Sequence, residues 1–266
     1  MKNRKSVYGI IALLFAIGFY VYNNYSYDEI SVRNNSKNNS IANFLPTSTT
    51  GQIVKHHYYT LSYHEKYEQA EWVAYELTNK QVSSANFKRP YFIKDPKVKT
   101  QSANYKNYKN SGYDKGHLCP AADMNFSEEA FNETFLTSNI SPQNHDFNSG
   151  IWNRLEQKTR YWAQKYRNLY VVTGGILKPN LETIGSEKVA VPKYFYKIIL
   201  DFHEPDMKAI AFLIPHKKTE KGLYYFVTSI DEIEKLTNID FFHNLPDEIE
   251  NNIEASKNYT KWSLHK

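Results

Sequence analysis

One histidine and two oxygen-bearing side chains stand at spacings that suit hydrolysis of a phosphodiester. His117 lies in segment 113–120, and Asn148 and Glu156 follow it by 31 and 39 residues. An imidazole, with a pKa near about 6.5, is well matched to deprotonating water at neutral pH. Amide and carboxylate oxygens suit Mg2+, which stabilises charge on phosphate and leaving oxygens. The three residues therefore predict a metal-assisted phosphodiesterase with His117 as general base.

Residues 146–167 are predicted to form one amphipathic helix that carries Asn148 and Glu156. At about 100° per residue the two side chains are offset by about 80° and lie two turns apart, so both face roughly the same way. Asp146 is placed to cap the helix N-terminus, where a phosphate is also favoured. Polar groups beside a core-facing stripe are costly unless something uses them. The stripe consists of Ile151, Trp152, Leu155, Trp162, Ala163 and Tyr166.

These residues resemble the DNA/RNA non-specific endonucleases of the ββα-metal (His-Me finger) superfamily, which includes endonuclease G. The family's Asp-Arg-Gly-His signature is similar to 114–117, read here as Asp-Lys-Gly-His, and its Asn-x3-Trp-x2-Leu-Glu helix is similar to 148–156. The resemblance covers roughly residues 56–262. Further matching segments are Arg-Pro-Tyr-Phe-x2-Asp at 89–95, Ser-Asn-Ile-Ser-Pro-Gln at 138–143, and a C-terminal helix and tail at 229–246.

The resemblance implies a role for each site residue. His117 would activate water, Asn148 would hold Mg2+ (Mn2+ being possible), and Glu156 would position the water shell of the metal. Arg89 would contact the phosphate and offset transition-state charge. Asp114 would orient the motif loop. The implied substrates are DNA and RNA, and the implied products carry 5'-phosphates.

Lys115 departs from the family pattern, which has Arg at this position. Lysine keeps the charge but lacks the planar, bidentate guanidinium fork, so a close phosphate contact would be weaker. We expect Lys115 to bind substrate, and we expect the change from Arg to alter the cleavage rate or the substrate affinity without abolishing the chemistry.

Taken singly, the site residues have plainer interpretations. His117 alone could be a satisfied core histidine, Asn148 alone a helix cap, and Glu156 alone a solvated charge. Only their combination at family spacing favours an active site. The single cysteine, Cys119, cannot form an internal disulfide, and a zinc site needs more ligands, so packing beside the motif is its expected role.

The N-terminus predicts a targeting segment. Lys2, Arg4 and Lys5 precede an apolar run at 7–22, which lacks a good small-x-small cleavage site. Residues 1–22 are therefore expected to form a signal anchor rather than a cleaved signal peptide. That anchor would leave a membrane-attached, extracytoplasmic catalytic body, or a secreted or periplasmic one if cleavage occurred. Residues 23–52, rich in Asn and Ser, are expected to be a flexible tether before an enzyme domain at 53–266.

The expected fold is α+β, with a mostly antiparallel central sheet flanked by helices and a ββα-metal finger at about 112–167. Predicted strands lie at 58–63, 169–173, 194–202 and 208–214, rich in β-branched and aromatic residues. Segment 72–77 could be a strand or the start of a helix, and the family resemblance favours a hairpin. Predicted helices start after Ser127 and at Ser229, the latter with Asn238 as a left-handed cap.

Three classes of function remain open from the sequence. The first is a non-specific, Mg2+-dependent endonuclease. The second is an inactive nucleic-acid-binding relative, which Lys115 leaves open. The third is a membrane-tethered interaction protein that keeps only the fold. A net charge of +5 suits an anionic polymer but is a weak signal, and nothing in the sequence indicates the oligomeric state.

Overall fold

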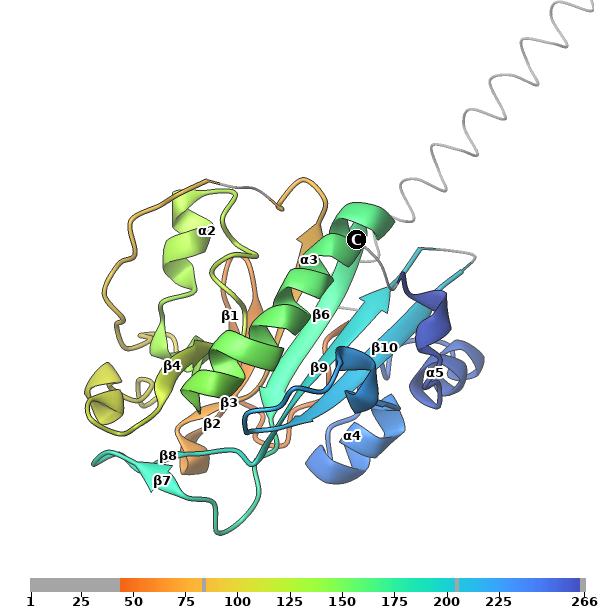
Figure 1. The fold of residues 1–266 in the computed structure, drawn as a ribbon. Coiled ribbons are helices and arrows are strands. Elements are labelled where there is room, and N and C mark those ends of the chain that lie inside the picture. The colour runs from red at the N-terminus through yellow and green to blue at the C-terminus, as the bar shows by residue number, and fades with distance from the viewer. Residues whose placement is uncertain (1–43, 83–84, 204–205, 264–266) are drawn as a thin grey trace, which may run out of the picture. The chain divides into compact units, whose positions relative to one another are not determined.

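An antiparallel sheet of seven strands forms the centre of the described part of the chain, residues 44–82, 85–203 and 206–263 of the computed structural model (Figure 1). Two smaller antiparallel pairs accompany it. In spatial order the large sheet consists of β1 (Ile53–Lys55), β2 (Thr60–His64), β3 (Gln69–Thr78), β6 (Asn168–Gly175), β9 (Tyr194–Asp201), β10 (Lys208–Pro215) and β11 (Val227–Thr228); the pairs are β4 (Asp114–His117) with β5 (Ile140–Gln143), and β7 (Thr183–Ile184) with β8 (Val189–Ala190).

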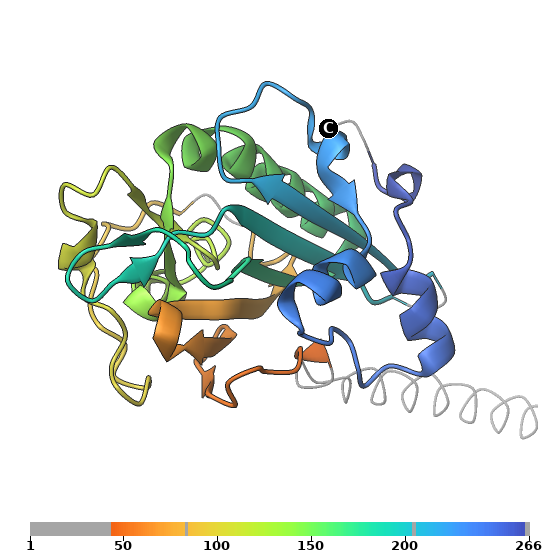
Figure 2. The same ribbon diagram turned by 90° about the horizontal axis from the view of Figure 1, so that it is seen from below.

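Helices cover both faces of the sheet. In Figure 2 the green helix α3 and the blue helices α4 and α5 lie on opposite sides of the strands. The α-helices are α2 (Glu128–Glu133), α3 (Asn153–Tyr166), α4 (Ile230–Thr237) and α5 (Asp247–Glu254); a π-helical turn is η5 (Phe147–Trp152); the 3-10 turns are η2 (Glu65–Tyr67), η3 (Tyr105–Tyr108), η4 (Thr137–Asn139), η6 (Leu223–Phe226) and η7 (Tyr259–Lys261).

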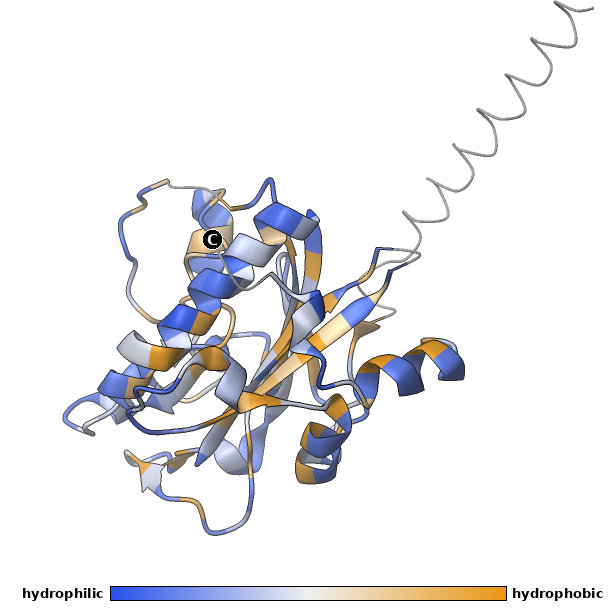
Figure 3. Cartoon of the chain, turned by 45° about the vertical axis from the view of Figure 1, so that its right-hand side comes forward, coloured by the Kyte–Doolittle hydropathy of each residue, from blue (hydrophilic) through white to orange (hydrophobic). Residues whose placement is uncertain are grey.

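Alternation along the strands creates two apolar cores, one on each face. On β3, Val73 and Tyr75 join the core beneath α3, whereas Trp72 and Ala74 join the core beneath α4 and α5. The helices alternate orange and blue segments in Figure 3, as expected of amphipathic helices with one buried stripe. The sheet is thus held rigidly between helices, and it supports the elements that carry the site residues.

The predicted α+β class is confirmed, and so are its main elements. The strands expected at 169–173, 194–202 and 208–214 are β6, β9 and β10. Segment 72–77 lies in β3 and pairs antiparallel with β2, so the hairpin alternative is the one observed. Ser229 caps α4 through a hydrogen bond from the Glu232 amide, and Asn238 ends that helix in the left-handed region at φ 58°.

The ββα finger is present as β4, β5 and the helix that follows, but the helix is not the single element expected at 146–167. It starts with the π-helical turn η5, in which Gly150 leaves helical geometry (φ −95°, ψ −109°), and α3 begins only at Asn153. Asp146 makes no capping hydrogen bond with its side chain. Asn144 caps instead, because its Oδ1 accepts from the Phe147 amide at 3.2 Å.

The predicted tether, 23–52, ends earlier than expected. Phe44 is 2% exposed and belongs to the core beneath α4 and α5. Trp72 donates its indole N–H to the Thr47 carbonyl at 2.9 Å, and Thr49 donates to the Glu71 carboxylate through both its amide and its hydroxyl. Residues 44–52 therefore belong to the folded body, and the remainder of the predicted tether lies outside the described residues.

Candidate active site

The six site residues predicted from the sequence line one open cleft of about 460 Å³. They come from the 89–95 segment, from β4, from η5 and from α3, and the fold brings them together across up to 67 residues of chain. A larger cavity of about 600 Å³ contains none of them. The cleft is lined by Arg89, Asp114, Lys115, His117, Asn148 and Glu156, together with Phe92, Tyr113, Pro120, Ala121, Ala122 and His145.

His117 stands at the end of β4 with its ring held between two phenyl groups. The ring centroids of Phe92 and Phe135 lie 5.6 and 5.0 Å from that of the imidazole. Its Nε2 is buried and has no hydrogen-bond partner among the described residues. Burial and the charge of Arg89 lower the pKa of His117 to about 3. The imidazole is therefore neutral at pH 7 and has a nitrogen lone pair free to accept a proton.

The backbone after His117 is clamped by Asn139. The Asn139 Oδ1 accepts from the Cys119 amide at 2.8 Å, and its Nδ2 donates to the carbonyls of Cys119 and Thr134 at 2.9 and 3.0 Å. Asn139 is fully buried, as is Cys119, which has the packing role expected from the sequence. Three backbone groups that would otherwise be unsatisfied are thus paired beside the base.

Replacing Asn139 with Ala should lower the free energy of unfolding by about 2–4 kcal/mol, because one buried donor and two buried acceptors lose their partner. Urea unfolding followed by circular dichroism measures the change. The matched control is Asn132→Ala on exposed α2 surface, which should stay within about 0.5 kcal/mol of wild type. Equal stability of the two variants would contradict the assignment of Asn139 as the clamp.

Gly116, next to His117, is required by space. An added Cβ would lie 2.2 Å from the side chain of Gln143, which packs over the β4 backbone from the paired strand β5. The paired strands therefore pack closely beside His117, and a larger residue at position 116 would have to displace the Gln143 side chain.

Asn148 sits in η5 with its amide oriented by Asp114. Its Nδ2 donates to Asp114 Oδ2 at 3.0 Å, and this contact leaves the Asn148 Oδ1 available as an oxygen ligand. The same Asp114 oxygen lies 3.0 Å from His145 Nδ1. Asp114 thus contacts the residue expected to hold the metal, which is a more specific position than the loop-orienting one inferred from the sequence.

Glu156 lies on α3 above a buried group of charges. Burial raises the pKa of Glu156 to about 7, with Lys197 and Arg160 opposing the shift and Asp123 adding to it. Lys197 is fully buried on β9, where its Nζ donates to Thr173 Oγ1 at 2.6 Å. Asp123 is paired with Arg160 at 2.6 Å. The pKa of the Glu156 carboxyl therefore lies close to neutral pH. A cation in the cleft would favour its ionised form.

Arg89 and Lys115 place two cations in the lining of the cleft. The Arg89 guanidinium lies 5.8 Å from the ring centroid of Phe135, and the Lys115 ammonium lies 5.5 Å from that of Phe92. The 89–95 segment, which carries Arg89, is anchored by Asp95, a fully buried carboxylate that accepts a hydrogen bond from the Ser138 hydroxyl. Asp95, the last residue of the 89–95 motif, is thus a structural anchor outside the cleft.

Two further histidines at the site, His145 and His216, were not predicted from the sequence. His145 lines the cleft and is exposed. His216 Nε2 accepts from the Asn144 amide at 2.6 Å while its Nδ1 donates to the Pro192 carbonyl at 2.7 Å, so it holds the turn before η5 in place. The position of His145, three residues before Asn148, is a local signal that could have been used. His216 stands 72 residues from Asn144, and no spacing in the sequence links the two.

The metal ligands expected at this site have suitable chemistry. The Asn148 carbonyl and the Glu156 carboxylate are hard oxygen donors that line the same cleft, which suits Mg2+ or Mn2+. With only Asn148 and Glu156 as ligands, most coordination positions would remain for water, and Mg2+ usually retains several waters.

Known proteins resemble this chain over most of its length. The model of the DNA/RNA non-specific endonuclease family matches residues 36–248. The mitochondrial nuclease EXOG of Danio rerio is 35% identical over 201 residues, 69% of this chain and 59% of that protein. Mitochondrial endonuclease G of Homo sapiens is 30% identical over 209 residues, 73% of this chain and 70% of that protein. The chain thus spans about three-fifths of EXOG.

A solved structure shares the fold. The crystal structure of an EndoG/EndoGI complex superposes with a TM-score of 0.69 at 27% identity, covering 73% of this chain and 87% of that chain. That structure describes the mechanism of EndoG inhibition.

The expectation of a membrane-anchored enzyme needs correction. The anchor predicted at 1–22 lies outside the described residues, and no helix within 44–82, 85–203 or 206–263 is long and apolar enough to cross a membrane. The apolar run at 7–22 is itself shorter than the about 20 residues that a span requires. EXOG and endonuclease G are named as mitochondrial. Neither a membrane partner nor a membrane-anchored, extracytoplasmic location is supported.

The match extends over most of the described body and includes every segment that lines the cleft. Family model, relatives and solved structure agree with one another. This chain belongs to the DNA/RNA non-specific endonuclease family.

Proposed function

We propose that the protein is a metal-dependent, sequence-non-specific endonuclease that hydrolyses phosphodiester bonds in DNA and RNA and leaves 5'-phosphate ends. One observation carries the proposal. The Nε2 of His117, which has no hydrogen-bond partner among the described residues, shares a cleft with the Asn148 amide, the Glu156 carboxyl and the two cations Arg89 and Lys115. This set contains a base, a pair of oxygen ligands and a binding wall for phosphate.

His117 removes a proton from water through Nε2, and the resulting hydroxide attacks phosphorus in line with the departing 3'-oxygen. A Mg2+ or Mn2+ ion held by Asn148, with Glu156 positioning its waters, would stabilise charge on the leaving oxygen. Arg89 and Lys115 hold the phosphate and offset the charge that develops on it. Asp114 keeps the Asn148 oxygen directed toward the cleft. Breaking the bond between phosphorus and the 3'-oxygen leaves the phosphate on the 5' end of the downstream fragment.

Contacts of this kind carry no sequence information, since both cations would meet the phosphate backbone rather than base edges. The net charge of +5 adds a long-range attraction for nucleic acid. Cleavage without sequence preference follows from the composition of the cleft.

The full-length chain should cut both circular DNA and structured RNA in Mg2+, and EDTA should stop the reaction because the leaving oxygen loses its stabilisation. Gel analysis of the products measures cutting. A 5'-phosphate predicts that polynucleotide kinase labels the fragments only after phosphatase treatment. Salt-sensitive binding without cutting in Mg2+, Mn2+ or Ca2+ would instead identify an inactive nucleic-acid-binding relative.

A further inference from the structure

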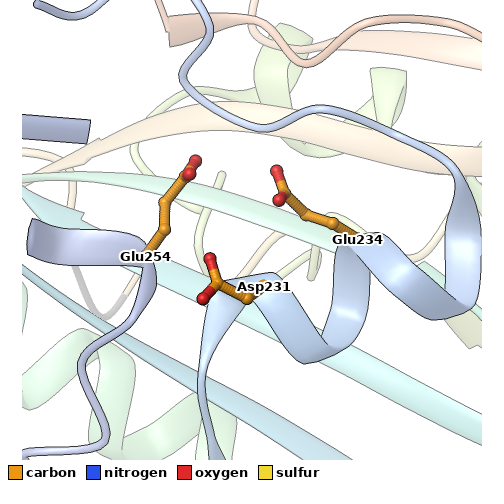
Figure 4. Close-up of side chains that lie close together, drawn as sticks. All are labelled: Asp231, Glu234 and Glu254. Carbon is orange, nitrogen blue, oxygen red and sulfur yellow. The ribbon is translucent and has the colours of Figure 1, made fainter. Parts of the chain in front are cut away.

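A second group of acidic residues lies on the face of the sheet opposite α3, between α4 and α5. Figure 4 shows the carboxylates of Asp231 and Glu234 on α4 and of Glu254 at the end of α5 directed toward one another. One oxygen from each lies within 4.8 Å of the others. Glu254 also forms a second such group with Asp240 and Glu250. Four acidic side chains thus surround the carboxylate of Glu254.

Glu254 is buried without a partner. It is only 7% exposed, and its Oε1 accepts no hydrogen bond from any described residue. No lysine, arginine or histidine of the described part forms an ion pair with any of the five carboxylates. Within the described part of the chain, the polar contact to the three-carboxylate group comes from the Phe241 amide, which donates to Glu234 at 2.8 Å. Burying an unpaired carboxylate is costly, and repulsion within the group adds to that cost.

The apolar surroundings make the arrangement more demanding. Ile230 and Ile233 of α4 and Ile253 of α5 pack into the core beside the acidic side chains. Burial and the neighbouring carboxylates raise the pKa of Glu254 to about 9. A bound cation would offset both the burial of Glu254 and the repulsion from its neighbours.

We propose that Asp231, Glu234 and Glu254 bind a calcium ion that fastens α5 to α4. All available ligand atoms are oxygens, and the group contains no histidine or cysteine, which disfavours zinc. The ligands come from two separate helices, so the site can adapt its geometry. Calcium accepts six to eight oxygens in flexible arrangements and takes carboxylates in one- or two-oxygen modes, whereas magnesium demands a near-ideal octahedron. Asp240 and Glu250 lie close enough to Glu254 to add ligands or to attract the ion.

The proposal is tested by thermal unfolding of the full-length chain in EDTA, in CaCl2 and in MgCl2. Calcium at about 100 times its dissociation constant should raise the melting temperature by about 5–10 °C, and magnesium should raise it less. Glu254→Gln should abolish the calcium shift while leaving the protein at least as stable in EDTA, because the amide keeps the size of the side chain and carries no charge that could repel its acidic neighbours. That second expectation separates loss of binding from failure to fold.

Two controls separate this site from the cleft and from general electrostatics. Asn148→Ala, which removes the proposed catalytic ligand, should keep the full calcium shift. Glu232 also lies on α4, but it is half exposed and paired with Lys235. Glu232→Gln makes the same substitution outside the acidic group and should also keep the calcium shift. Calorimetry of Asn148→Ala should find one calcium, and none after adding Glu254→Gln. A shift that survives Glu254→Gln, an absent shift, or equal shifts with magnesium and calcium would overturn the assignment.

Discussion

Replacement of His117 with Ala should reduce the rate of DNA and RNA cleavage by about 10²–10⁴-fold, the usual contribution of a positioned general base. His117 is suited to the role because its burial keeps the imidazole neutral and its Nε2 has no competing partner among the described residues. The negative charge of a bound phosphate would offset the charge of Arg89 and raise the pKa of His117. Initial rates in saturating Mg2+ provide the measurement.

The residual activity of His117→Ala should have two distinguishing properties. Its rate should increase with pH, because hydroxide from solution replaces water activated by the enzyme. Added imidazole should restore part of the rate by entering the space beside Phe92 and Phe135. His57→Ala serves as the control, since His57 is exposed and does not line the cleft. Activity of His117→Ala within tenfold of wild type, or a loss matched by unfolding, would exclude His117 as the base.

The sequence predicted the elements whose patterns are local. The strands β6, β9 and β10 are largely apolar and rich in β-branched and aromatic residues because the sheet is buried on both faces, and such runs can be recognised in the sequence alone. Helix α4 has a serine cap at its start and an asparagine in the left-handed region at its end, and both signals are intrinsic to those residues. The resemblance to a known family favoured a hairpin strand over a helix at 72–77, which no local pattern decided.

The sequence missed features that depend on contacts between distant segments. Periodicity placed Asn148 and Glu156 on one continuous helix, but it cannot reveal the break at Gly150 or the cap from Asn144. His216, directly after β10, accepts a hydrogen bond from the Asn144 amide and so supports that cap. The 44–52 segment looked like a tether because its composition is polar. Its hydroxyls instead satisfy Glu71, a contact that no local pattern reveals.

Asn148→Ala should lower cleavage about 10³-fold, and raising the Mg2+ concentration should not restore it, because the direct oxygen ligand is gone and the several kcal/mol supplied by the ion are lost. Asp114→Ala should have a milder effect, about 10–100-fold in metal affinity, since the Asn148 amide remains but is no longer held by its hydrogen bond at 3.0 Å. High Mg2+ should therefore restore much of the Asp114→Ala activity. The measurement is the Mg2+ dependence of the rate for each variant.

His145→Ala is the matched control for this pair. It removes the other hydrogen-bond partner of Asp114, yet His145 is exposed and leaves the Asp114 contact with Asn148 intact, so its Mg2+ dependence should follow that of wild type within about threefold. The three variants order the contacts by their distance from the ion: ligand, partner of the ligand, and partner of that partner. If Asp114→Ala and His145→Ala were equally impaired, Asp114 would act through His145, and the orientation of Asn148 would need another source. If Asn148→Ala recovered in high Mg2+, the ion would be held mainly by other groups of the cleft, with Glu156 the first to test.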